Sequence, residues 1–360
     1  MKKLICFIFV FLSTILSSYA IDISAESAIL YDCYSDRIVY EKNADDRRPI
    51  ASTTKIMTAL IALEHYDVNK EVTIKPEWCG IEGSSMYLTA GETLKIGELI
   101  YGLMLASGND AATALGSIYD GNISSFVDLM NKKANELGLI NTHFENPSGL
   151  DSENHYSTSK EMALLTKYAL QNNYFAKVCS TKQYNIESRF MANHNKLLFL
   201  LKGTVGVKTG YTEKAGRCLV SAVNREGRLL IAVTLNAPDD WEDHKKLYNI
   251  GFSDMQFRNV LKKGFIGYIN VAGYGSTPLY IKNDFEAYLS QDEIDRIEVS
   301  LKGQRIVYSG FSEDEQYGTL TIRLDGKIIH TEPVYFQETV CKETPTYTFW
   351  EKLIRLFSKR

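Results

Sequence analysis

The chain has 360 residues, of which 45% are hydrophobic and 23% are charged, and its formal net charge is -4. This composition is that of an ordinary globular protein, which excludes a disordered, collagenous or low-complexity chain. The near balance of acidic and basic residues argues against a dedicated nucleic-acid binder, and the length suggests about two domains.

The first twenty residues differ from the rest of the chain. Lys2 and Lys3 precede an unbroken apolar run, and Ser18 and Ala20 are small residues at the positions that a signal peptidase reads. We therefore expect residues 1–20 to be a cleaved secretory signal peptide and the mature protein to be exported, beyond the cytoplasmic membrane. The alternative is an uncleaved N-terminal anchor.

Residues 21–260 alternate strand-like and helix-like stretches, which predicts an α/β (α+β) domain. Apolar spacing predicts helices over 56–63, 96–106 and 125–137. Strands are predicted over 27–31, 38–40 and 228–235. The last of these contains β-branched residues and no breaker, so we expect it to be a buried central strand.

Residues 261–342 show short alternating runs between turn signals, so a small all-β domain is predicted there. One hairpin is expected between 296–301 and 305–308. A second is expected between 319–324 and 327–330, across the favourable Asp325-Gly326 turn.

Residues 343–360 form a tail whose last twelve residues, from Phe349, are amphipathic. As a helix they would be about 18 Å long, too short to cross a bilayer. An aromatic face opposite a basic face suits a helix that lies at the outer face of the cytoplasmic membrane. A terminal helix docked on the preceding domain is the open alternative.

Two residues near the start of the first predicted helix form a possible nucleophile and base. A serine hydroxyl needs a base beside it to be nucleophilic. Ser52 and Lys55 are three residues apart, so on a helix they share one face. Burial among apolar neighbours would lower the pKa of Lys55 and favour the neutral amine that can accept a proton. Taken alone, the S-x-x-K pattern is weak, and a helix N-cap with a solvated lysine is its more common explanation.

Two further short motifs follow along the chain. Ser107 and Asn109 come directly after an apolar stretch and could relay a proton and orient a peptide, or simply form a polar turn. Lys208, Thr209 and Gly210 suggest an edge strand beside a cleft, with a cation and a hydroxyl suited to a carboxylate. A surface turn is the alternative for this motif.

The order S-x-x-K, S-x-N, K-T-G is that of penicillin-binding proteins and class A β-lactamases. With its flanking residues, the chain resembles the low-molecular-weight penicillin-binding proteins, which are serine-type D-alanyl-D-alanine carboxypeptidases. This family has a small β domain after the catalytic domain and a C-terminal amphipathic membrane helix. The resemblance implies a β-lactamase/transpeptidase-like fold and no metal or cofactor.

The resemblance also implies an acyl-enzyme mechanism. Ser52 attacks the carbonyl between the two terminal D-alanines of a peptidoglycan stem peptide, and Lys55 accepts its proton. Ser107 and Asn109 assist proton transfer and orientation. β-Lactam antibiotics would acylate Ser52 and be lost slowly.

Substrate binding follows from the same resemblance. Lys208 and Thr209 would hold the terminal carboxylate beside Gly210, and the backbone N–H groups of Ser52 and Tyr211 would form the oxyanion hole. The stretch 193–195 matches an Asn-x-Asn motif of the family, with His194 where some members have an arginine.

Two other functions remain as alternatives. A class A-like β-lactamase would need a glutamate base with a nearby asparagine, and that E-x-x-x-N spacing is missing between the second and third motifs. A wall- or β-lactam-binding sensor would acylate without turnover. The chain lacks the H-E-x-x-H motif of a zinc peptidase. It has two isolated E-x-H triplets, 153–155 and 242–244, which we interpret as surface features.

Overall fold

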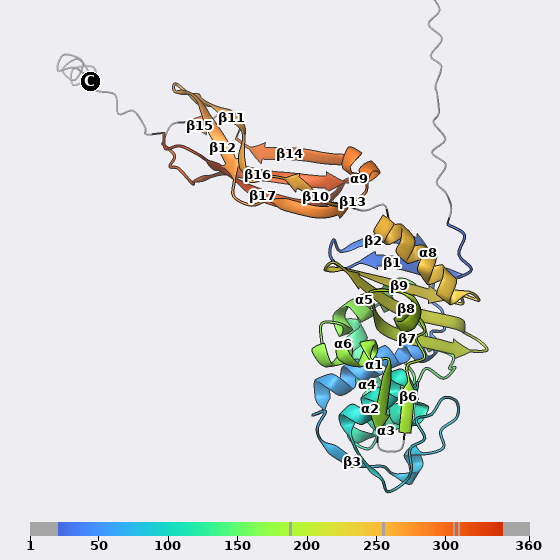
Figure 1. Cartoon of the computed structure of the whole chain (residues 1–360). Helices are drawn as coiled ribbons and strands as arrows, with labels where there is room; N and C mark the ends of the chain where they lie inside the picture. Colours follow the sequence, from blue (N-terminus) through green and yellow to red (C-terminus); the bar gives the residue numbers. More distant parts are fainter. Residues whose placement is uncertain (1–20, 187–188, 254–255, 305–306, 309, 341–360) are drawn as a thin grey trace, which may run out of the picture. The chain divides into compact units, whose positions relative to one another are not determined.

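The computed structural model describes residues 21–340, apart from 187–188, 254–255, 305–306 and 309 (Figure 1). The chain divides into two compact units. The first unit contains the described part of Met1–Cys33 together with Ile38–Asn249, and the second contains Tyr34–Arg37 together with the described residues from Ile250 onward. The domain limits expected from the sequence, 21–260 and 261–342, remain predictions. The expected signal peptide and tail lie outside the described residues. Within the described part of the chain, no helix is both long and apolar enough to cross a membrane.

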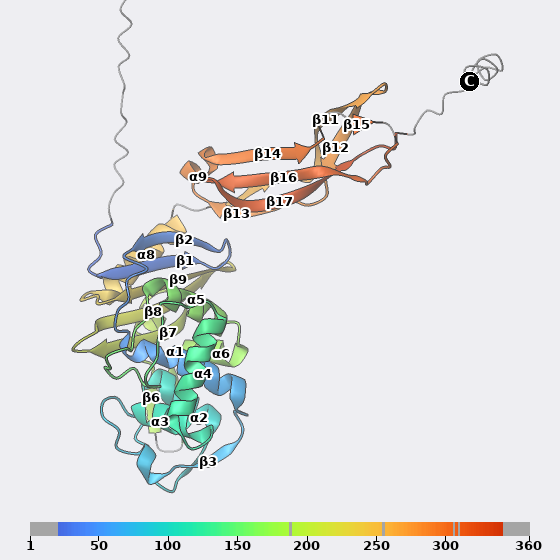
Figure 2. The same ribbon diagram turned by 180° about the vertical axis from the view of Figure 1, so that it is seen from behind.

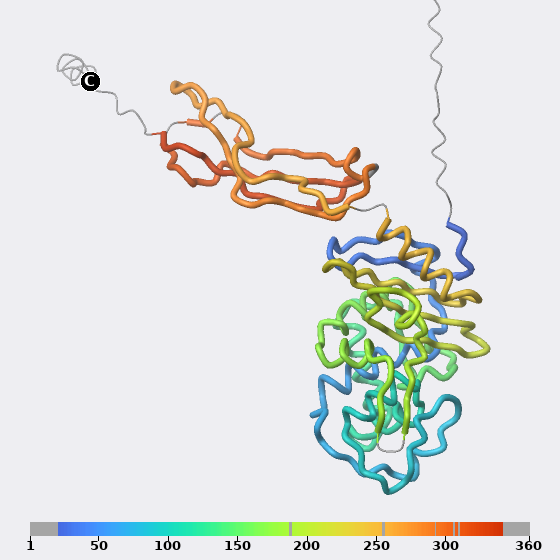
Figure 3. The backbone as a smooth tube through the Cα atoms, in the orientation of Figure 1, coloured from blue at the N-terminus to red at the C-terminus, as the bar shows by residue number. Residues whose placement is uncertain are grey.

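A five-stranded sheet forms the centre of the first unit, in the order β2-β1-β9-β8-β7. The strands are β1 (Ser27–Asp32), β2 (Arg37–Lys42), β7 (Thr204–Thr212), β8 (Gly216–Arg225) and β9 (Arg228–Leu235). In the middle strand, Ile231 pairs antiparallel with Tyr31 of β1 and with Ala222 of β8. Figure 3 shows β1 beside β9, although the whole helical region separates them in sequence. The predicted central strand is therefore confirmed with its predicted bounds.

Both faces of this sheet are covered, which explains why β9 is apolar except at Arg228 and Thr234. Ile231 and Val233 point into the main core beneath the helices. On the opposite face, Ser221 and Thr234 contact α8 (Asp240–Ser253). The Nδ1 atom of His244 lies 2.6 Å from the Ser221 hydroxyl and its Nε2 atom 2.9 Å from the Thr234 hydroxyl.

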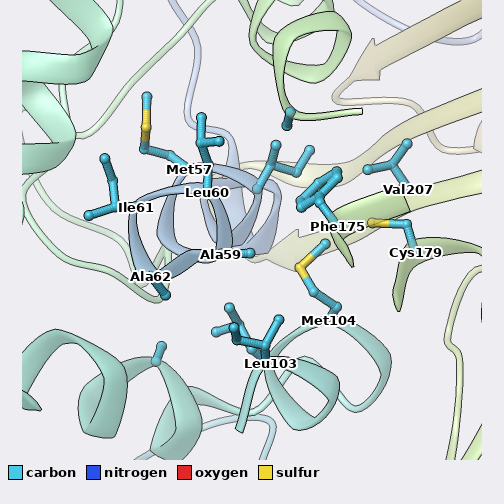
Figure 4. Close-up of a cluster of buried hydrophobic side chains, with 14 of the residues drawn as sticks. Met57, Ala59, Leu60, Ile61, Ala62, Leu103, Met104, Phe175, Cys179 and Val207 are labelled. Carbon is cyan, nitrogen blue, oxygen red and sulfur yellow. The ribbon is translucent and has the colours of Figure 1, made fainter. Parts of the chain in front are cut away.

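Helix α1 (Lys55–His65) lies at the centre of the first unit, and its residues from Lys55 to Ala62 are buried. Figure 4 shows Met57 and Leu60 of α1 in the same apolar cluster as Met104 and Phe175. Figures 1 and 2 show the surrounding helices from opposite sides. These helices are η1 (Ala51–Thr54), α2 (Ile96–Leu105), α3 (Asn109–Ile118), α4 (Ile123–Glu136), α5 (Ser159–Ala169), α6 (Asn173–Ser180) and α7 (Leu197–Leu200).

Short elements complete the first unit. They are β3 (Glu71–Thr73), η2 (Pro76–Trp78), β4 (Thr93–Lys95), β5 (Gln183–Ile186) and β6 (Arg189–Ala192). Strand β3 pairs with β4, and β5 pairs with β6.

The second unit is rich in β structure. Its six-stranded sheet has the order β14-β16-β17-β12-β11-β15, and β10 pairs separately with β13. The elements are β10 (Gln256–Leu261), β11 (Gly264–Ala272), β12 (Gly275–Ile281), β13 (Phe285–Leu289), α9 (Gln291–Asp295), β14 (Ile297–Gly303), β15 (Val307–Tyr308), β16 (Gln316–Leu324) and β17 (Lys327–Phe336).

Of the two hairpins expected in this unit, one is confirmed and one is wrong. Leu324 pairs with Lys327 across the Asp325-Gly326 turn, as predicted. In contrast, β14 pairs with β16 along its whole length, from Ile297 to Gly303, and β15 pairs in parallel with β11. The longer ladder on β16 satisfies more backbone groups of β14 than the short β15 could.

Candidate active site

The serine of the first motif lies on a strained turn before α1. Ala51, the preceding residue, has a positive φ of 46°, a conformation that is costly for a residue with a side chain. Ser52 follows in η1, and Lys55 begins α1. The Nζ atom of Lys55 lies 2.9 Å from the Oγ atom of Ser52. The local spacing therefore brings the two groups into contact, as the sequence predicts.

The surroundings of Lys55 favour its neutral form. Its side chain is completely buried, and its Nζ atom also donates to Asn109 Oδ1 at 2.7 Å and to the Ser148 carbonyl at 2.6 Å. Burial and the nearby positive charge of Lys208 hold the pKa of Lys55 well below its ordinary value, and the charge of Asp110 opposes them. A neutral amine beside a hydroxyl can act as a general base.

The second motif forms the turn between α2 and α3. Ser107 has a positive φ of 57° and is almost fully buried. Asn109 connects this turn to the loop before it, because its backbone N–H donates to the Ser84 carbonyl at 2.7 Å and its Nδ2 donates to the Glu82 carbonyl at 2.6 Å. Asn109 thus links that loop to Lys55.

The third motif lies on β7, which is the edge strand of the sheet. A Cβ atom at Gly210 would lie 3.0 Å from the backbone nitrogen of Ser52, so glycine allows the strand to approach Ser52 closely. Lys208 is buried, and its Nζ atom donates to the Thr209 carbonyl at 2.8 Å. Burial lowers the pKa of Lys208 to about 7, against an opposing effect of Cys179.

Most of the predicted site residues line one cavity of about 310 Å³. Its lining residues are Ser52, Ser84, Ser107, His194, Lys196, Thr209, Gly210, Tyr211, Arg217, Asp240 and Trp241. Three other predicted site residues are outside this lining. Lys55 and Asn109 are hydrogen-bonded to each other behind Ser52, and Lys208 is bonded to the carbonyl of Thr209.

Residues 14–239 match the model of the D-alanyl-D-alanine carboxypeptidase family, peptidase family S11. This chain belongs to that family. It is 30% identical over 342 residues to D-alanyl-D-alanine carboxypeptidase DacF of Bacillus subtilis, covering 88% of this chain and 86% of DacF. It is 33% identical over 363 residues to DacA of Escherichia coli K12, covering 92% of this chain and 86% of DacA.

Solved structures agree with the family assignment. DacD from Francisella tularensis superposes with a TM-score of 0.73 at 25% identity, covering 90% of this chain and 95% of that one. Penicillin-binding protein 5 from Haemophilus influenzae gives a TM-score of 0.70 at 27% identity, covering 89% and 98%. The expected fold, an α/β catalytic part followed by a β-rich part, is confirmed.

In this D-alanyl-D-alanine carboxypeptidase family member, one wall of the cavity consists of residues that the sequence analysis did not predict, namely Arg217, Asp240 and Trp241. Arg217 of β8 pairs with Tyr211 of β7. Its Nε and Nη2 atoms donate to Asp240 Oδ1 at 3.1 and 2.7 Å, and its guanidinium carbon lies 5.8 Å from the Trp241 ring centroid. Asp240 therefore fixes a guanidinium in the wall of this cavity. The sequence could have indicated this position, because a hairpin that turns shortly after Lys208 brings Arg217 back beside Tyr211.

Asp110 was also missed, although it follows the second motif directly. Its buried carboxylate accepts from the backbone N–H groups of Met86 and Leu88, each at 3.0 Å, and from the Ser85 hydroxyl at 2.6 Å. These bonds hold the loop that brings Ser84 into the cavity lining.

The Asn-x-Asn stretch supports another part of the wall. Asn193 Nδ2 donates to the Thr181 carbonyl at 3.0 Å, and Asn195 Oδ1 accepts from the Leu197 N–H at 3.1 Å. His194 lies between them in the cavity lining. Partial burial and the charge of Lys208 lower the pKa of His194.

The interpretation of the two histidine triplets as surface features is wrong for the histidines themselves, although Glu153, Asn154 and Glu242 are exposed. His155 is buried, with Nε2 2.7 Å from the Thr54 hydroxyl and Nδ1 accepting from the Glu145 N–H at 3.1 Å. His244 is buried between α8 and the sheet. Each ring has a hydrogen-bond partner at both nitrogens, which makes its burial tolerable.

Proposed function

We propose that this chain is a serine-type D-Ala-D-Ala carboxypeptidase that removes the terminal D-alanine from peptidoglycan stem peptides. The observation that carries the proposal is the 2.9 Å contact between Lys55 Nζ and Ser52 Oγ. The lysine is buried and its pKa is lowered, so it can be neutral when the serine reacts. Membership of the family supports the choice of substrate.

The acylation step assigns a role to each group around Ser52. Its Oγ atom bonds to the carbonyl carbon of the penultimate D-alanine, and its proton passes to Lys55 Nζ. When the tetrahedral intermediate collapses, the C–N bond breaks and the leaving amine takes a proton through Ser107. Water then hydrolyses the ester, and the Ser52 hydroxyl is restored. Asn109 keeps Lys55 in position through their 2.7 Å hydrogen bond.

Two backbone N–H groups, those of Ser52 and Tyr211, form the proposed oxyanion hole. The close approach of Gly210 to the Ser52 nitrogen supports this assignment, because it brings β7 up to the turn that carries the nucleophile. One such donor is often worth about 3–4 kcal/mol in the transition state.

The terminal carboxylate of the substrate needs cationic and hydroxyl partners. We assign these to Thr209 and Arg217, which line the cavity together with Ser52. Lys208 does not line the cavity, and its Nζ atom donates to the Thr209 carbonyl. We therefore assign to it an attraction for the substrate carboxylate through its charge and no direct hydrogen bond. β-Lactams, which resemble the D-Ala-D-Ala terminus, would acylate Ser52 in the same cavity.

We further propose that the protein is exported and attached to the outer face of the cytoplasmic membrane. The basic and apolar composition of residues 1–20 supports export, and the amphipathic sequence from Phe349 to Arg360 supports peripheral attachment. Deletion of residues 349–360 would then release the mature protein from membranes into the soluble fraction. Retention of the deleted protein on membranes would contradict this part of the proposal.

The enzymatic proposal is tested by D-alanine release from a defined pentapeptide together with labelling by a fluorescent penicillin. The wild-type protein is expected to do both, and Ser52→Ala to do neither. Labelling without release would favour the sensor function, and rapid penicillin hydrolysis would favour a β-lactamase. Release by Ser52→Ala would refute the assigned nucleophile.

A further inference from the structure

A second cavity, of about 640 Å³, adjoins the catalytic one within the first unit. Its lining residues are Ser84, Ser85, Met86, Tyr87, Ala106, Arg189, Phe190, Met191, Ala192 and His194. Ser84 and His194 line both cavities, so the two spaces adjoin at these residues. The sequence motifs and the acylation chemistry make no use of this second space.

Two large aromatic side chains stand exposed in the wall of this second cavity. Tyr87 is 80% exposed and Phe190 63% exposed, and they come from different elements, the loop before β4 and strand β6. Water-exposed aromatic rings at the edge of a cavity are typical of binding surfaces, where they bury a large area at small entropic cost. The cavity therefore has the composition of a ligand site.

Both walls are held in place without a ligand. Asp110 accepts from the backbone N–H groups on either side of Tyr87, at Met86 and Leu88. On the other wall, the guanidinium of Arg189 donates to Glu92 at 2.7 Å. A site whose walls are already ordered loses little entropy when a ligand binds.

We propose that this second cavity binds the part of the stem peptide on the acyl side of the scissile bond, with Phe190 and Tyr87 packing against it. This inference rests on the proposed function. The leaving group is a single alanine whose carboxylate is assigned to Thr209 and Arg217 in the first cavity. The acyl side is several residues long, and an extended chain advances about 3.3–3.6 Å per residue, so it must leave the first cavity. Ser84 and His194 line both cavities whereas Arg217 lines only the first, so the second cavity is the adjoining space without the assigned carboxylate partner.

Peptide-length selectivity tests this assignment. D-Alanine release is measured from a full stem pentapeptide and from a diacylated tripeptide ending in D-Ala-D-Ala. Contacts with remote parts of a substrate raise kcat/KM only for substrates that have those parts. Phe190→Ala should lower the ratio of the two kcat/KM values, long to short, by about tenfold, the loss typical of one good aromatic contact. Ala192→Trp, which fills the same cavity, should lower the ratio as well.

Phe199→Ala is the matched control, because Phe199 is a similarly exposed phenylalanine, at 51%, outside the lining of both cavities. It should leave the ratio unchanged. An unchanged ratio in Phe190→Ala and Ala192→Trp, with wild-type release intact, would overturn this inference and leave the proposed function standing. If only a disaccharide-linked pentapeptide responded to the variants, the cavity would bind glycan and the peptide assignment would be refuted. Absence of release from both peptides by the wild type would refute the proposed function itself.

Discussion

The Nζ atom of Lys55 lies 2.7 Å from the Oδ1 atom of Asn109, although the two residues are on different helices. An amide oxygen orients the amine without contributing the full negative charge of a carboxylate. The buried lysine therefore keeps a lowered pKa while its position is fixed. This pairing connects the first and second motifs and leads to two predictions about pH.

Asn109→Asp should shift the acid limb of the pH profile for penicillin acylation to higher pH. A carboxylate at this position stabilises the protonated form of Lys55, so its pKa rises and more alkaline conditions are needed to make the base neutral. The rate of acylation against pH measures the shift. Asn135→Asp, which makes the same charge change at an exposed position of α4, should leave the profile in place. An unchanged acid limb in Asn109→Asp would contradict the role of Lys55 as base.

Lys208→Gln should move the same acid limb in the same direction. The positive charge of Lys208 lowers the pKa of Lys55, so its removal raises that pKa. The profile is again measured with penicillin acylation, which needs no peptide substrate. A shift to lower pH would show that Lys208 does not act on Lys55 through its charge.

Arg217→Leu should lower kcat/KM for a peptide with a free terminal carboxylate by about tenfold to a hundredfold, the usual worth of a charge-assisted hydrogen bond. The corresponding peptide with a C-terminal amide lacks the negative charge, so its kcat/KM should fall far less in this variant. Arg225→Leu, on the same strand but outside the cavity lining, is the control and should behave like the wild type. Equal losses for both substrates would mean that Arg217 only supports the wall.

Gly149→Ala should destabilise the protein far more than Gly138→Ala. Both glycines have a positive φ, 84° and 73°, which costs an alanine about 1–2 kcal/mol. A Cβ atom at Gly149 would also clash with the carbonyl oxygen of Ala51, whereas at Gly138 it would meet nothing within 4 Å. We expect a total loss of about 3 kcal/mol or more at Gly149, from strain plus overpacking, measured by urea unfolding. Similar losses in the two variants would show that the turn before Ser52 can move.

The stability of the first unit should fall as the pH drops below about 6.5. Burial lowers the pKa of His155 to about 4 and that of His244 to about 3, while both titrate near 6.5 in the unfolded chain. The unfolded state therefore binds more protons in this window, so stability is full above pH 6.5 and declines toward pH 3–4. His244→Gln should flatten this decline in urea midpoints, and His65→Gln, at an exposed site on α1, should not. A slope unchanged by His244→Gln would assign the acid sensitivity to other groups.

Much of the fold follows from local patterns that the sequence displays. Helix α1 forms where apolar spacing predicts it, because a helix makes its backbone hydrogen bonds within itself. Strand β9 forms where a run of β-branched and apolar residues predicts it, although its hydrogen bonds depend on the neighbouring strands β1 and β8. The Ser52–Lys55 contact is also local, since residues three apart share a helix face. The expected hairpin before β15 failed because turn signals do not reveal which distant strand competes for pairing.

The sequence by itself determined the three motifs, their order and the local geometry of the first one. Only the tertiary structure decided where Asn109 lies, hydrogen-bonded to Lys55 behind Ser52, and which further parts complete the site: Arg217 held by Asp240, and the second cavity beside Phe190. The burial of His155 and His244 was decided in the same way. Periodicity reports the contacts of neighbours in the chain, whereas burial and cavity walls arise from segments that meet only after packing. The lowered pKa of Lys55 is one such consequence, because it depends on the surroundings that the whole fold provides.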